Sequence, residues 1–195
     1  MKQLILLPFI IFALLLGGCV MNAVVTGQIQ KKSAEQGAVF EELKDNAPDA
    51  GFSVLTIRAT MKTVKEGFYP LGSRNSLHGK PEYPFVFNIG GQGVVWMARG
   101  ATDIQPRQTN SHRNPEGGEG VKYTLEKKIG IKPGIYRVYI GLSKEKLQKE
   151  INIILTGDNA GILEFKPVYR RDRGRGPRFH KGLSYFEVFL DGKKI

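Results

Sequence analysis

Cysteine is scarce in this sequence. The 195 residues include one cysteine, Cys19, so no disulfide can form within the chain. A single thiol also excludes a zinc site built from several thiolates. Stability must therefore come from a hydrophobic core. With 41% hydrophobic and 10% aromatic residues, the composition is sufficient for one, which excludes general disorder.

Motifs of the common enzyme classes are absent as well. The chain has no HExxH, no P-loop, no GxSxG and no dinucleotide-binding glycine pattern. His78, His112 and His180 lie far apart in sequence, so we expect no metal site and no cofactor. Glu116 and Glu119 are the candidate carboxylates for glycoside chemistry, but their glycine-rich surroundings favour a solvated surface. We expect no catalytic residue, with a polymer hydrolase as the alternative.

The apolar run near the start of the chain is too short to cross a membrane as a helix. It extends from Leu4 to Leu16, below the roughly 18 residues that a span requires, and it contains Pro8. Lys2 precedes it and the small residues Gly17 and Gly18 follow. A basic start, an apolar segment and a small-residue cleavage site predict a signal peptide over residues 1–18.

The residues Leu16-Gly17-Gly18-Cys19 resemble the lipobox of bacterial lipoproteins. The resemblance covers residues 1–19. It implies that the Cys19 thiol receives diacylglycerol, that the chain is cleaved before Cys19 and that the new amine is acylated. Two or three acyl chains give a stable membrane anchor. Val20, which is not the aspartate that retains such proteins in the inner membrane, favours the outer membrane. The alternative is an ordinary secretory signal with an incidental cysteine.

The charge is strongly positive and unevenly distributed. The formal net charge is +11, and residues 166–181 contain seven cations with Asp172 as the one acid. Such an excess favours anionic partners. The candidate binding residues lie in one predicted basic hairpin: Arg170, Arg171, Arg173, Arg175 and Arg178, flanked by the rings of Tyr169 and Phe179. The alternative is a solvated tip that keeps a sheet edge from pairing with neighbours.

From residue 52 onward, apolar residues alternate with polar ones, which predicts strands. About eight strands are expected, at Leu55–Met61, Phe85–Ile89, Val94–Trp96, Val121–Leu125, Tyr136–Leu142, Ile151–Leu155, Leu163–Phe165 and Phe186–Leu190. Short strands and glycine-rich turns indicate an all-β antiparallel sandwich or barrel. The stretch Lys132–Val138 is similar to one hairpin of transthyretin-like or immunoglobulin-like modules. We therefore predict a β-sandwich.

Four segments fall outside this pattern. Residues 19–32 are expected to form a lipidated tether, followed by a β-sandwich domain at 33–195. Within the domain, capping-box spacing at Ser33 and Gln36 predicts a short helix over residues 34–45. Residues 66–83 and 100–120 are predicted to be long loops, and the second is expected to be mobile because it is polar and glycine-rich.

Together these features predict a membrane-anchored envelope lipoprotein that acts as a non-catalytic binding or assembly module. Its expected partners are the membrane, through the anchor, and anionic lipid, glycan or another envelope protein. Nucleic acid is disfavoured, because an exported lipoprotein meets little of it. The alternatives are a hydrolase of envelope polymers and a structural accessory subunit of an envelope complex.

Overall fold

The computed structural model describes residues 38–44, 48–67, 76–109, 112–142, 145, 147–156, 161–174 and 176–195. The predicted signal peptide, Cys19 and the tether lie outside them. The described part is built of strands, with one 3-10 turn, η2 (Phe179–Lys181), and no α-helix. The strands are β1 (Phe40–Leu43), β2 (Ser53–Thr63), β3 (Glu82–Ile89), β4 (Gln92–Gln105), β5 (Gln108–Thr109), β6 (His112–Arg113), β7 (Gly118–Ile131), β8 (Gly134–Leu142), β9 (Leu147–Leu155), β10 (Gly161–Tyr169), β11 (Arg171–Asp172), β12 (Gly176–Pro177), β13 (Leu183–Leu190) and β14 (Lys193–Lys194).

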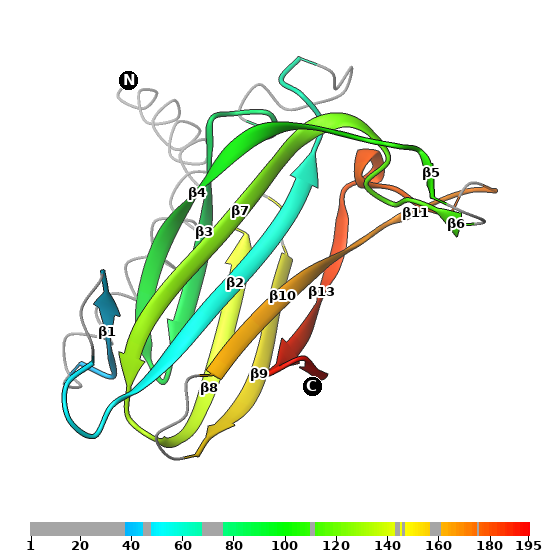
Figure 1. The fold of residues 1–195 in the computed structure, drawn as a ribbon. Helices are drawn as coiled ribbons and strands as arrows, with labels where there is room; N and C mark the ends of the chain where they lie inside the picture. The colour runs from blue at the N-terminus through cyan, green and yellow to red at the C-terminus, as the bar shows by residue number, and fades with distance from the viewer. Residues whose placement is uncertain are drawn as a thin grey trace, which may run out of the picture.

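Ten of these strands join in one sheet that curls strongly (Figure 1). The order is β14-β13-β10-β2-β7-β4-β3-β8-β9, and β1 adds to the free edge of β7. The curl brings β13 close to β9, at the far end of the order. The predicted all-β class is confirmed, whereas a sandwich of two separate sheets is not. The pairing is also not wholly antiparallel, because β10 runs parallel to β2.

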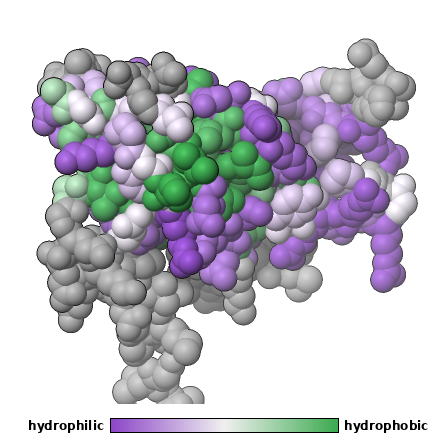
Figure 2. All heavy atoms as spheres, turned by 90° about the horizontal axis from the view of Figure 1, so that it is seen from below, coloured by the Kyte–Doolittle hydropathy of each residue, from purple (hydrophilic) through white to green (hydrophobic). Residues whose placement is uncertain are grey.

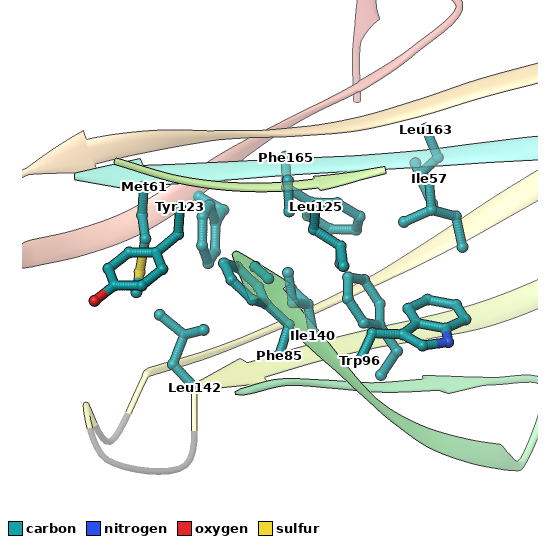
Figure 3. Close-up of a cluster of buried hydrophobic side chains, with 14 of the residues drawn as sticks. Ile57, Met61, Phe85, Trp96, Tyr123, Leu125, Ile140, Leu142, Leu163 and Phe165 are labelled. Atoms are coloured by element: carbon teal, nitrogen blue, oxygen red, sulfur yellow. The ribbon is translucent and has the colours of Figure 1, made fainter. Parts of the chain in front are cut away.

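The hydrophobic core fills the inside of the curl. Side chains from β2, β7 and β10 meet side chains from β3, β4 and β8 across the interior (Figure 3). Phe87 lies 5.1 Å from Trp96 and 5.6 Å from Phe165 between ring centroids. Burying one such side chain stabilises the fold by roughly 1.5–3 kcal/mol. The inward residues follow the period of two seen in the sequence, so all eight predicted strands are confirmed.

Two turns follow directly from local sequence. Gly90 and Gly91, with φ of 58° and 98°, connect β3 to β4. Positive φ at both central residues is the geometry that matches the twist of a two-residue hairpin, and glycine adopts it without strain. Lys132 and Pro133 connect β7 to β8, within the stretch Lys132–Val138 that the sequence predicts to be a hairpin.

The helix predicted over residues 34–45 is wrong where the structure describes it. Residues 34–37 and 45 lie outside the described part, and Phe40–Leu43 form strand β1. The reason is tertiary: β4 pairs with β7 only as far as Arg99 and Thr124, which leaves the edge of β7 near Ile131 open. β1 supplies the missing partner, and the Gln92 side chain fixes its start by accepting the Phe40 N–H and donating to the Phe40 carbonyl.

The loop predicted at residues 100–120 is largely sheet. β4 continues to Gln105 and β7 begins at Gly118, and these ends pair with each other. Between them β5 and β6 form a small hairpin, whose Asn110 and Ser111 lie outside the described residues. The other predicted loop, 66–83, ends in β3, and its residues 68–75 are also outside. Among the described residues, no helix is long and apolar enough to span a membrane.

Candidate anion-binding pocket

Two small hairpins lie side by side at one end of the sheet, the β5–β6 hairpin and the β11–β12 hairpin (Figure 1). A pocket of about 380 Å³ opens between them. Its lining residues are Arg107, Gln108, Arg113, Asn114, Gly117, Pro177 and Arg178. On the side where these hairpins lie, the surface is mainly hydrophilic, whereas apolar residues gather in the middle of the view from below (Figure 2). We call this site the arginine pocket.

Three arginines and no acidic residue are among the lining residues of the arginine pocket. Within the part of the chain that the structure describes, no acid forms an ion pair with Arg107 or Arg113. Arg178 approaches Asp172 at 3.9 Å, but Asp172 also pairs with Lys181 at 3.4 Å. Arginine forks match the oxygens of phosphate and carboxylate. The pocket therefore has the charge and the donors to bind an anion.

The β5–β6 side of the pocket is held by Asn114 and Gly117. The Asn114 side chain donates to the Pro106 carbonyl at 3.2 Å and accepts the Glu116 N–H at 3.0 Å. Gly117 is buried beneath the hairpin, where a Cβ would come within 2.6 Å of the Arg107 Cα. Position 117 requires a glycine because the backbone at Arg107 passes so close to it. The glycines interpreted in the sequence as a sign of mobility instead allow tight packing.

A backbone hydrogen bond joins the two hairpins. The Phe179 N–H donates to the Pro115 carbonyl at 2.9 Å. Phe179 follows Arg178 directly, so this bond fixes the position of Arg178 relative to the β5–β6 hairpin. Gly120, on β7, makes room for the Phe179 ring, since a Cβ there would lie 2.8 Å from the Phe179 Cε2.

Beneath the pocket, the ammonium group of Lys62 is fully buried. Lys62 Nζ lies 2.7 Å from Asp103 Oδ2 and donates to the carbonyls of Glu116 and Gly118, both at 2.8 Å. It also lies 4.8 Å from the centre of the Phe179 ring. Three acceptors satisfy all three ammonium donors. Because two of them belong to the chain on either side of Gly117, Lys62 fixes the floor of the arginine pocket.

The charge of Lys62 affects the pKa of the neighbouring Asp103. Burial alone would raise the pKa of Asp103, but hydrogen bonds from Lys62 and Gln105 and the charges of Lys62 and Lys122 outweigh burial and lower it. Lys62 and Lys122 are directly opposite each other on β2 and β7, an arrangement that repels. Asp103 compensates the first lysine, and Glu116 compensates the second at 2.8 Å.

Tyr169 completes this buried network. Its hydroxyl donates to Glu116 Oε1 at 2.8 Å and accepts the Lys62 N–H at 2.8 Å. Burial, and then the charge of Glu116, raises the pKa of Tyr169 well above its ordinary value. The pairing of β10 with β2 ends at Phe165 and Ala59. The Tyr169 hydroxyl therefore satisfies a backbone N–H that the separating strands leave open.

The positive charge around the pocket also affects the pKa of His180. Burial first, then the charges of Arg178, Lys62 and Arg107, lowers the pKa of His180 below its ordinary value of 6.5. The unfolded chain then binds more protons than the folded protein between that lowered pKa and 6.5. Stability therefore rises with pH across this window, and it falls as the pH drops below 6.5.

We expect a bound dianion to raise the pKa of His180, because it offsets the charges of Arg107 and Arg178. Sulfate is the suitable probe, since its own charge stays constant near neutral pH. By linkage, sulfate should bind more tightly as His180 becomes protonated. The measurement is an NMR pH titration of the His180 ring with and without sulfate. An unchanged pKa at saturating sulfate would show that the anion binds elsewhere.

The structure separates the residues of the predicted basic hairpin. Arg178 lines the arginine pocket, whereas Arg170, Arg171 and Arg173 are exposed and not among its lining residues. The charge of Arg170 instead contributes to lowering the pKa of Glu145, to which the hydrogen bond from His78 contributes most. Arg175 and Cys19 lie outside the described residues. The flanking rings of Tyr169 and Phe179 are buried and cannot stack on a ligand.

The residues considered for catalysis do not converge. Glu116, expected on the solvated surface, is half-buried and fixed by Tyr169 and Lys122, while Glu119 is exposed and pairs with Lys65 at 2.5 Å. His78 pairs with Glu145, whose carboxylate also accepts the Tyr83 hydroxyl at 3.3 Å. Among the described residues, no group of three or more potential ligands could hold a metal ion.

Sequence reasoning missed Arg107, Arg113 and Lys62. The two arginines stand in the segment predicted to be a mobile loop, and Lys62 occupies a polar position of an alternating strand. The charge of the predicted loop gave no signal for the arginines, because residues 100–120 contain three acids and two arginines. In comparisons with known proteins, no family model, no curated protein and no solved structure matches this chain.

Proposed function

We propose that this protein is a lipid-anchored envelope lipoprotein whose β-domain binds an anionic envelope component through the arginine pocket. The observation that carries the proposal is the convergence of Arg107, Arg113 and Arg178 on one pocket without a lining carboxylate. The lipobox resemblance of Leu16 to Cys19 supports the anchor, and Val20 favours the outer membrane. We propose no catalytic step.

The binding half of the proposal is tested with the native protein in its membranes. Cross-linking followed by purification should recover the same anionic glycan or envelope protein repeatedly. A variant with Arg107, Arg113 and Arg178 replaced by glutamine should not recover it. Equal recovery by both proteins would show that the arginine pocket is not the binding site.

The anchoring half predicts that Cys19→Ser leaves an uncleaved or mislocalised precursor. A serine hydroxyl cannot replace the thiolate in the alkylation step, because its oxygen stays protonated at neutral pH. Cell fractionation combined with metabolic labelling by a radioactive fatty acid measures the effect. Normal membrane retention with undiminished label in the variant would refute the lipoprotein assignment.

A further inference from the structure

The arginine pocket lies at the end of the sheet far from the point where the anchoring segment joins it. β7 runs between the two ends: Gly118 follows Gly117 of the pocket, and Ile131 pairs with Phe40 at the start of β1 (Figure 1). A strand of 14 residues spans up to about 45 Å at an antiparallel rise of ~3.4 Å per residue. The pocket is therefore separated from the attachment point by the length of the sheet.

The donors of the pocket are arranged for a group with more than one charge. Three arginines line it, and Asp172 offsets part of the charge of Arg178. A carboxylate carries one negative charge, whereas a phosphate monoester carries about 1.5–2 at neutral pH and presents three acceptor oxygens. The charge and the number of donors favour the phosphoryl group.

The size of the pocket indicates that the ligand extends beyond its anionic group. A volume of about 380 Å³ falls within the range of roughly 300–1,000 Å³ typical of small-molecule sites. None of the described lining residues carries an aromatic ring on which a base could stack. The Asn114 amide is used to hold the hairpin, which leaves Gln108 as the neutral side chain that can donate to and accept from a hydroxyl group.

We infer that the arginine pocket binds the phosphorylated sugar of a glycan held away from the anchoring membrane, and not the lipid head groups of that membrane. The inference rests on the proposed function and specifies its ligand. The position of the pocket at the end of the sheet opposite β1 favours a ligand away from the anchoring membrane. The charge favours the phosphoryl group, and the volume, together with Gln108, accommodates the sugar.

Two matched sugars test the ligand, with the full chain purified in neutral detergent. Glucose 6-phosphate should bind at least about tenfold more tightly than glucuronate by calorimetry, because the second charge and third oxygen engage further arginine donors. The variant with Arg107, Arg113 and Arg178 replaced by glutamine should lose this preference. Equal affinity for the two sugars would overturn the phosphoryl assignment.

Reconstitution tests the orientation. The full chain is inserted into vesicles of phosphatidylcholine alone or of phosphatidylcholine with phosphatidylglycerol. The affinities for glucose 6-phosphate on the two kinds of vesicle should agree within about twofold, because the surface potential of the anionic lipid is screened over a distance shorter than the sheet. A loss of more than about tenfold on the anionic vesicles would show that the pocket lies at the surface of its own membrane, and would overturn the inference alone. Absence of binding by every anion would instead overturn the proposed function.

Discussion

Replacing Arg107, Arg113 and Arg178 together by glutamine should weaken anion binding by about a hundredfold. A basic side chain near an anionic lipid surface contributes about 1 kcal/mol. With the same contribution from each arginine of the pocket, the loss of three corresponds to roughly two powers of ten in affinity. The fold should survive, because Arg107 and Arg113 are exposed, Arg178 is partly exposed, and exposed substitutions usually change stability by less than about 0.5 kcal/mol. Binding of sulfate and of glucose 6-phosphate by calorimetry, across a salt series, measures the effect.

The matched control replaces Arg170, Arg171 and Arg173 by glutamine. It removes the same number of charges from the β11–β12 hairpin, at three positions that are not among the lining residues of the pocket. Long-range attraction falls equally in both variants, so their difference isolates the contacts within the pocket. A similar loss in the control would show that net charge, and not the arginine pocket, determines binding.

Replacing Lys62 by methionine should cause the largest loss of stability among single charge substitutions. The change leaves Asp103 and the carbonyls of Glu116 and Gly118 without their cation. Removing one partner of a buried ion pair typically costs about 3–5 kcal/mol. In a domain of this size that corresponds to a fall of roughly 10 °C in Tm. Thermal unfolding monitored by circular dichroism provides the measurement.

Lys65→Met is the matched control for this prediction. Lys65 pairs with Glu119 in the same region, with side chains that are 46% and 48% exposed, and such surface pairs contribute about 0–1 kcal/mol. Adding Asp103→Asn to Lys62→Met should recover part of the lost stability, because it removes the isolated negative charge. An equal fall in Tm for Lys62→Met and Lys65→Met would mean that Lys62 does not hold the pocket floor.

The alternation of apolar and polar residues predicted most of the strands, because it shows which face of a strand is buried. Leu55, Ile57 and Ala59 are inward-facing in β2 for this reason. The same pattern could not show which strands pair, since a sandwich and one curled sheet both require an apolar inner face. It also could not reveal that Phe40–Leu43 would form a strand, because the open edge of β7 that they cover arises only after β4 diverges.

The sequence by itself determined the all-β class, the hairpin turn at Gly90-Gly91 and the excess of positive charge, each of which depends on neighbouring residues. Only the tertiary structure decided where that charge is concentrated. Arg107 and Arg113 meet Arg178 because the strands carry two hairpins, distant in sequence, to one end of the sheet. Lys62 lies on the outward face of β2, where a lysine is ordinarily solvated, and it is buried because Phe179 covers it. A contact between residues so far apart along the chain depends on the packing of the whole sheet, which no local pattern encodes.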